Sequence, residues 1–271
     1  MAGKWFRILF FGMVIMGAAS QSGAFSSATH LYIADQVFQS RYPEPNPDLY
    51  YGSFAPDLDF FVKPGKWLTA TGDTHYSFVD IRPYASNPDQ MAFAEGWLTH
   101  NEKDPWGADH YAHVDPGYVV KKAERLTGVN TEFAHRAVEV AVDLLLKNDD
   151  PGIGEKLLDA LKRHPWKDRA FLMEVFGKEE KRTDRLTVMR AEMDFRRLMI
   201  QYGKALVLPP PNDLEALAEW GVQLARKLYG LSVSPDYIRE TLEDTIDLCK
   251  DDYKEAVDQA IQGMKDHFGL P

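Results

Sequence analysis

Residues 130–146, NTEFAHRAVEVAVDLLL, decide the fold class. Asn130 is a good helix-capping residue, and the apolar residues that follow it, such as Val142 and Leu146, recur at helical spacing. His135 and Glu139 lie on the same i, i+4 line as these apolar residues, so both polar side chains are expected to point inward. The stretch therefore predicts a long amphipathic helix that brings a histidine and a carboxylate into the protein interior.

The remainder of the chain has the same helical character. Asn87-Pro88-Asp89 combines a capping side chain, a proline at the first helical position and an acid in the first turn, and it predicts a helix with His100 on its apolar stripe. Further helices are expected near 29–40, 152–163, 168–177, 183–204, 212–229 and 235–265, and the proline-rich residues 41–56 are expected to form a loop with at most a short turn. No useful strand pattern is present. We therefore expect one all-α domain over residues 25–271, with the helices of His100 and His135 packed face to face.

The first 24 residues have the features of an export signal. Lys4 and Arg7 form a positive n-region, residues 8–16 are an apolar run, and Ser22-Gly23-Ala24 has small residues at the positions that a signal peptidase reads. The apolar run is shorter than the about 20 residues that span a bilayer. We predict a signal peptide over residues 1–24 and a periplasmic or secreted mature protein, with an uncleaved N-terminal anchor as the alternative.

Composition limits both the partners and the metal ligands. The formal net charge is −10, and loss of Lys4 and Arg7 would remove two positive charges and make it −12. This acidity argues against a stable nucleic-acid partner, which normally meets a basic surface. Cys249 is the only cysteine, so the chain cannot form an intrachain disulfide or a thiolate zinc site. Any metal must therefore bind to His, Asp, Glu or main-chain atoms.

Two spacings suggest metal ligands: His100-x3-Asp104, followed by His110, and His135-x3-Glu139. Residues four apart on a helix project side by side, about 6 Å apart, which suits two ligands of one metal. About one such pair is expected by chance in a chain of this composition, and an ion pair explains either pair taken alone. Both pairs, however, lie on inward faces of apolar helices, where a histidine and an acid without a metal would be costly to desolvate.

Upstream residues extend this pattern and bring out a family resemblance. His30, Asp57 and His75 stand in apolar surroundings, and together with the two pairs they exceed the needs of one zinc ion, which implies a cluster. The order resembles the zinc-dependent phospholipase C family, related to the S1/P1 nucleases: His30, Asp57, His75, His100-x3-Asp104-x5-His110, His135-x3-Glu139. The phrase Gly-Ser-Phe-Ala-Pro-Asp, residues 52–57, looks more like the phospholipase branch. The resemblance implies an all-α multi-helix bundle with about three zinc ions.

The resemblance also implies ligand roles. Asp57, His75, His100 and Asp104 would bind the first zinc, and His110, His135 and Glu139 would bind the second. His30 and Asp104 would bind the third together with the main chain of Phe25, the expected mature N-terminus, so that Asp104 bridges two ions. His113 is expected to lie behind the ligands or at the surface. The sequence departs from the family pattern at Pro105-Trp106-Gly107, which interrupts the helix between Asp104 and His110.

From this resemblance we expect a phosphodiester hydrolase of phospholipase C type, which releases a phosphorylated head group with a metal-activated hydroxide. Asp57 is the candidate general base, because a carboxylate beside a metal-bound water is placed to accept its proton. The substrate would be a phospholipid or another phosphodiester, with peripheral membrane contact and a monomeric protein. An S1/P1-like nuclease or 3′-nucleotidase is the first alternative, and a membrane-associated protein that binds zinc without turnover is the second.

Overall fold

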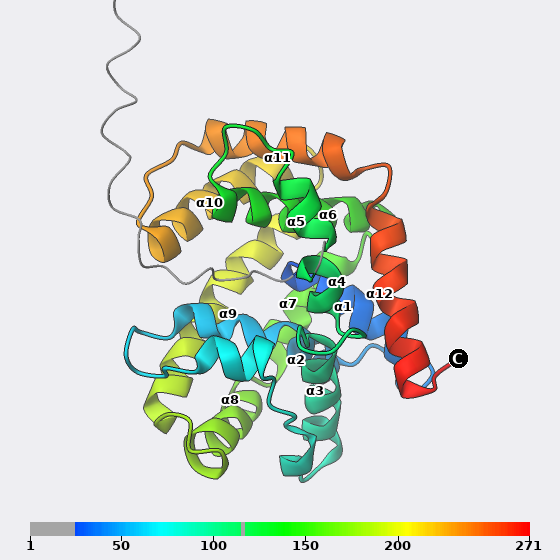
Figure 1. The fold of residues 1–271 in the computed structure, drawn as a ribbon, viewed down its shortest axis with the longest axis vertical. Helices are drawn as coiled ribbons and strands as arrows, with labels where there is room; N and C mark the ends of the chain where they lie inside the picture. The colour runs from blue at the N-terminus through cyan, green and yellow to red at the C-terminus, as the bar shows by residue number, and fades with distance from the viewer. Residues whose placement is uncertain (1–24, 115–116) are drawn as a thin grey trace, which may run out of the picture.

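Twelve α-helices and four shorter helical turns make up the part of the chain that the computed structural model describes, residues 25–114 and 117–271 (Figure 1). These residues contain no strand, which confirms the all-α fold. None of the helices among them has the length and apolar character needed to cross a bilayer. The predicted signal peptide, residues 1–24, lies outside the described residues.

The elements follow one another with short connections. The α-helices are α1 (Ser27–Phe38), α2 (Pro47–Phe54), α3 (Pro88–Thr99), α4 (Ala108–His113), α5 (Tyr118–Ala123), α6 (Thr131–Asp149), α7 (Ile153–Arg163), α8 (Pro165–Glu174), α9 (Arg185–Val207), α10 (Asn212–Tyr229), α11 (Pro235–Cys249) and α12 (Tyr253–Phe268). The short turns are η1 (Ala55–Phe61), η2 (Gly72–Tyr76), η3 (Arg82–Tyr84) and η4 (Val175–Glu179); η1 and η3 are 3-10 turns, and η2 and η4 are π-helical.

Helix starts follow the predicted capping chemistry. The Asn87 side chain accepts from the amide of Gln90 at the start of α3, and Asn130 caps α6 in the same way. The prediction of a loop over residues 41–56 was wrong, because these residues contain α2 and the start of η1. Asn46 accepts from two amides of α2 and Pro47 occupies its first position, so this proline belongs to a helix start rather than to a loop.

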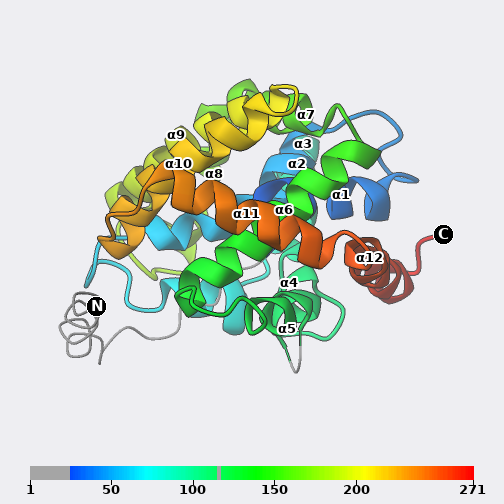
Figure 2. The ribbon, with the colours of Figure 1, turned by 90° about the horizontal axis from the view of Figure 1, so that it is seen from above.

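Helix α1 runs through the centre of the molecule (Figures 1 and 2). It packs against α2, α3, α6, α7 and α12, and both its apolar residues and its polar residues Thr29 and His30 are buried. The predicted face-to-face packing of the His100 and His135 helices was wrong. Helix α3 packs chiefly on α2, whereas α6 packs chiefly on α11 and α5, and α1 contacts both α3 and α6.

Two glycines bring α2 and α3 into close contact. A Cβ added at Gly52 would lie 2.0 Å from the carbonyl oxygen of Phe93, and one added at Gly96 would lie 2.0 Å from that of Leu49. Any side chain at either position would therefore push the two helices apart. This close packing places the carbonyl of Ser53, next to Gly52, within 3.0 Å of Nδ1 of His100 just beyond the end of α3.

Candidate metal centre

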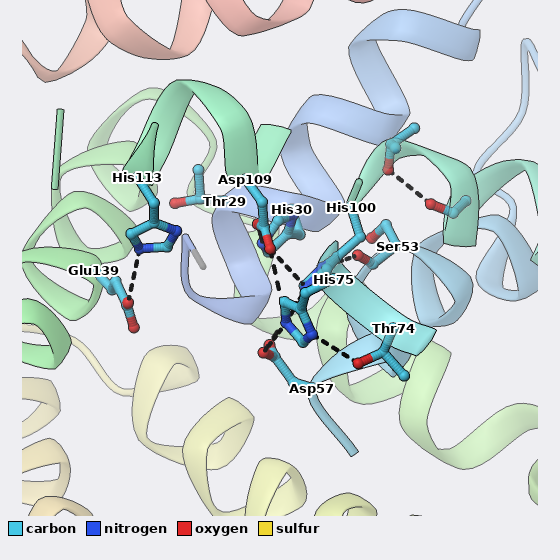
Figure 3. Close-up of polar contacts among 12 residues, drawn as sticks. Thr29, His30, Ser53, Asp57, Thr74, His75, His100, Asp109, His113 and Glu139 are labelled. Atoms are coloured by element: carbon cyan, nitrogen blue, oxygen red, sulfur yellow. Dashed lines mark hydrogen bonds and ion pairs between the residues drawn. The ribbon is translucent and has the colours of Figure 1, made fainter. Parts of the chain in front are cut away.

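Seven side chains of metal-ligand type meet in the interior of the protein, where Figure 3 shows them around Asp109. They come from six separate elements, and between 0% and 9% of each side chain is exposed. We call them the buried cluster: His30 of α1, Asp57 of η1, His75 of η2, His100 at the end of α3, Asp109 and His113 of α4, and Glu139 of α6.

One part of the buried cluster combines His75, His100 and Asp57. The Nε2 atoms of the two histidines are 3.1 Å apart, and Oδ1 of Asp57 lies 3.8 and 3.9 Å from them. Zinc binds imidazole nitrogen and carboxylate oxygen at about 2.0–2.2 Å, so ligands of one tetrahedral ion lie roughly 3.3 Å from each other. These three atoms have separations close to those of ligands that share one metal ion.

Asp109 joins this part of the cluster to His30. Its Oδ2 lies 3.2 Å from Nε2 of His100 and 3.7 Å from Nε2 of His75, while its Oδ1 lies 3.2 Å from Nε2 of His30. The His30 and His100 rings are stacked with their centroids 4.1 Å apart. Because its two oxygens face different histidines, the Asp109 carboxylate has the geometry of a bridging ligand.

A second part of the cluster lies toward α6, on the far side of Asp109 in Figure 3. Nε2 of His113 is 3.9 Å from Oε1 of Glu139, and the half-buried ring of His135 lies with its centroid 6.2 Å from that of His113. Potential ligand atoms of His113, Asp109 and Glu102 also lie within 4.8 Å of one another. This part offers two imidazoles and a carboxylate, a donor set that suits zinc.

The buried cluster also contains most of the buried polar atoms that lack a hydrogen-bond partner. Ten such side-chain atoms occur among the described residues, and they belong to His30, Asp57, Asp59, Asp109, His113 and Glu139. All of these residues except Asp59 are cluster members, and Asp59 faces His75 from behind, with its Oδ2 3.9 Å from Nδ1. A buried polar atom without a partner costs about 1–3 kcal/mol, so native proteins rarely keep several in one place. Coordination of a cation would supply the missing partners.

Burial and neighbouring charges shift the pKa values of the cluster residues. Burial lowers the pKa of His30 to about 4 and raises the pKa of Glu139 to about 8. Burial also raises the pKa of Asp109 well above its ordinary value. Burial would lower the pKa of His75 too, but the carboxylates around it raise that pKa to about 9. Groups shifted in both directions within one buried site are typical of a functional centre.

Neighbouring side chains fix the orientation of the ligands. The carboxylate of Asp143 on α6 accepts from the amides of Ala28 and Thr29 at 3.0 and 2.7 Å, and this anchors the first turn of α1 just before His30. The hydroxyl of Thr74 lies 2.7 Å from Nδ1 of His75, so that Nε2 of that ring faces the cluster. Such outer contacts set the direction and the basicity of metal-binding histidines.

The predicted site residues fall into two groups. His30, Asp57, His75, His100 and Glu139 lie in the buried cluster, and His135 lies beside it. The buried ring of Phe25 meets the His30 ring at a centroid distance of 6.3 Å, and its main chain is close enough to that ring to act on its pKa.

Asp104 and His110 form no group of potential ligands with the other described residues. The Asp104 side chain accepts from the amide group of Asn101 at 2.9 Å. His110 lines a separate cavity of about 740 Å³ between α4, α5 and α12. The i, i+4 argument for His100 and Asp104 requires a helix through both residues, but α3 ends at Thr99 and the chain forms turns as far as Gly107.

The sequence reading missed Asp109 and set His113 aside. Both lie on the short helix α4, where Asp109 faces His30 and His100 and His113 faces Glu139. Asp109-x3-His113 is itself an i, i+4 pair of an acid and a histidine, so the same spacing rule could have found it. Gly107 stands at the N-cap of α4, so it begins the helix that carries both residues.

Comparison with known proteins agrees with this geometry. A model of the family described as zinc dependent phospholipase C matches residues 29–194, which include every member of the buried cluster. Neither the curated proteins nor the solved structures contain a significant match. Since the matched residues make up more than half of the 271-residue chain, and the all-α fold and the buried cluster agree with the match, the protein belongs to the zinc-dependent phospholipase C family.

Proposed function

We propose that the protein is an exported zinc-dependent phosphodiester hydrolase of phospholipase C type, with about three zinc ions in the buried cluster. The observation that carries the proposal is the concentration of buried polar atoms without partners among carboxylates and imidazoles that face one another. These donors fit zinc, which accepts nitrogen and oxygen ligands in one site. Family membership supports the same metal.

The proposed ligand sets follow the distances within the cluster. Asp57, His75, His100 and Asp109 would hold the first ion, and His113, His135 and Glu139 the second. His30 and Asp109 would hold the third together with the main chain of Phe25. In these sets Asp109 takes the bridging place that the sequence prediction gave to Asp104, and His113 takes that of His110.

The chain's own residues would then take separate roles in the reaction. Bound zinc ions lower the pKa of a coordinated water to about 7 and neutralise charge on a phosphoryl group. Asp57 lines a pocket beside the cluster, so its carboxylate would be the group that accepts a proton from an attacking water. Asp109, held between His30 and His100, fixes the spacing of the histidines on both sides.

An assay of the purified protein tests the proposal. Zinc content is measured by elemental analysis, and hydrolysis is followed with phospholipid, a generic phosphodiester and single-stranded DNA, each with and without chelator. The expected result is about three zinc equivalents and chelator-sensitive hydrolysis of phospholipid. One zinc ion or none in protein purified without chelator would refute the cluster. Hydrolysis of DNA alone would assign the nuclease alternative, and full zinc content without hydrolysis would assign the non-catalytic one.

Export would complete the third zinc site. Cleavage after Ala24 creates an α-amine at Phe25, whose pKa near 7.7–8.0 makes it a usable metal ligand at neutral pH, whereas a peptide nitrogen inside an uncut chain is a poor one. Mass spectrometry of the exported protein should find Phe25 as the first residue. A mature chain that starts at Ser20 or Gln21 would exclude this ligand role.

A further inference from the structure

A small pocket lies directly beside the buried cluster. Asp57 and Glu139 form part of its wall, and most of the remainder is apolar, with Phe60, Phe61 and Trp220 among the aromatic residues. The pocket has a volume of about 40 Å³, room for one or two water molecules, so a substrate phosphoryl group would meet the cluster from the opening of the pocket, with its head group beside the aromatic side chains there. The charges in and around the pocket therefore bear on which head group the protein accepts.

Two cations already cover aromatic faces at this pocket. The guanidinium of Arg136 lies 4.5 Å from the ring centre of Phe60, and the ammonium of Lys227 lies 4.7 Å from the ring centre of Phe61. Aromatic faces attract cations, and they are the groups that commonly bind quaternary ammonium ligands. Here both phenylalanine rings have a cation of the protein in that position, so a choline-type head group would meet positive charge instead of an open ring face.

Arg136 is held in place beside the cluster. Its Nη1 donates to Oε2 of Glu139 at 2.8 Å, while the other oxygen of that carboxylate, Oε1, faces His113 at 3.9 Å. About 15% of the Arg136 side chain is exposed, and the residue lines the pocket. A guanidinium presents several N–H donors in a planar fork that matches the oxygens of a phosphate group.

We propose that this pocket selects anionic phosphate esters, with Arg136 donating to a non-bridging phosphoryl oxygen and Lys227 adding a second positive charge at the rim. The inference rests on the proposed hydrolase function and adds the class of head group: uncharged or anionic rather than quaternary ammonium. Arg136 is the stronger contributor, because Lys227 is exposed and lies 3.9 Å from the carboxylate of Asp194, which offsets part of its charge.

The test compares two lipids that differ in head-group charge. Zinc-loaded protein is assayed with phosphatidylglycerol and with phosphatidylcholine in identical neutral detergent micelles. We expect the wild type to prefer phosphatidylglycerol. Arg136→Met should raise KM for phosphatidylglycerol about 10- to 100-fold, as expected for loss of a hydrogen bond to a charged group, and should bring the two lipids close to equal. Arg136→Lys should restore part of the preference, since it returns the charge without the fork.

Binding of inorganic phosphate to the zinc-loaded protein gives a readout that does not depend on turnover. Isothermal titration should show about 10-fold weaker binding by Arg136→Met and a smaller loss by Lys227→Met, with zinc content equal to wild type in both. Arg226→Met is the matched control, because it removes a neighbouring exposed charge on α10 that contacts neither phenylalanine ring.

Two results would overturn the inference. One is a wild-type preference for phosphatidylcholine, and the other is unchanged phosphate affinity in Arg136→Met. Failure of the hydrolase proposal has a different signature, namely absence of zinc or absence of hydrolysis with either lipid. If zinc is bound but neither lipid is cleaved, the phosphate titration still decides the role of Arg136.

Discussion

Two groups of buried charged residues in this protein differ in how their polar atoms are satisfied. The first is the buried cluster around Asp109. The second is a buried ion network where α8 and α9 meet α2, made of Tyr51, Asp168, Arg169, Glu192 and Arg196. In the network, Arg196 contacts Glu192 and Asp168, Arg169 donates to Glu192 at 2.6 Å, and the hydroxyl of Tyr51 donates to Glu192 at 2.9 Å.

The polar atoms of the ion network satisfy one another, whereas several buried polar atoms of the cluster have no hydrogen-bond partner. In the network, two guanidinium groups donate to the carboxylates, and none of its atoms is among the described buried atoms without a hydrogen-bond partner. The buried cluster brings carboxylates and imidazoles together with no lysine among its members, and most of the described buried atoms without partners lie in it. Burial of charge is common to both groups, and only the cluster contains the groups of potential ligands that could hold a metal ion within its buried interior.

Removal of zinc should show the largest difference between the two groups, because only the buried cluster is expected to bind the metal. Binding at a free ligand concentration 1,000 times Kd stabilises a folded protein by about 4 kcal/mol. For a domain of this size, about 2–4 °C per kcal/mol converts that to a fall in Tm of roughly 8–16 °C on chelation. Calorimetry with and without chelator measures it, and re-addition of zinc should restore the original Tm. Equal Tm values would mean that the cluster does not depend on metal.

Substitution in the ion network should destabilise the protein whether or not zinc is present. Arg196→Met leaves the carboxylates of Glu192 and Asp168 buried with fewer partners, and breaking a buried pair costs about 3–5 kcal/mol. Denaturant unfolding with and without chelator measures the cost in both states. Arg163→Met, at an exposed i, i+4 pair with Asp159, is the control and should change stability by less than about 1 kcal/mol. A cost for Arg196→Met that vanishes on chelation would contradict the separation of the two groups.

The boundary of the cluster can be tested with two aspartates that lie five residues apart in the sequence. Asp109→Asn should lower zinc affinity by more than the 10- to 100-fold that outer-shell changes cost, because the carboxylate faces His30 on one side and His100 on the other. The Asp104 side chain accepts from Asn101 and belongs to no group of potential ligands among the described residues, so Asp104→Asn should bind zinc within a few-fold of wild type. Competition with a chelating dye measures both. Comparable losses in the two variants would restore Asp104 to the site.

The same pair of aspartates shows how far the sequence could predict the site. Helix starts at Asn87 and Asn130 depend on local capping chemistry, so α3 and α6 could be predicted from a few neighbouring residues. The buried cluster depends on six elements that are distant in sequence, and local rules identify its residue types but not which of them meet. Spacing singled out His100 and Glu139, the family resemblance grouped them with His30, Asp57 and His75, and the structure brings all five together in the buried cluster.

The errors in the sequence prediction have physical causes. The i, i+4 argument for His100 and Asp104 assumed a helix through both residues, whereas α3 ends at Thr99, Pro105 and Gly107 follow, and α4 starts afresh at Ala108. Helix α2 was missed because Pro47 was read as a loop residue, whereas proline at the first helical position replaces an amide that has no helical partner in any case.

The pH dependence of zinc affinity tests the buried cluster separately from the ion network. Glu139 has a pKa raised to about 8 and His75 one raised to about 9, so both are mostly protonated at pH 6.5 in the metal-free protein. Zinc binds the deprotonated forms, and each proton that must leave costs about tenfold in affinity per pH unit below its pKa. Affinity should therefore rise with pH between 6.5 and 9, and at least two protons should be released per chain at the lower pH, because burial also raises the pKa of the proposed ligand Asp109. Isothermal titration in buffers of different ionisation enthalpy counts these protons.

Arg196→Met should release the same number, because the ion network takes no part in metal binding. Zinc affinity that is flat between pH 6.5 and 9, with no proton release, would show that Glu139 and His75 are not ligands.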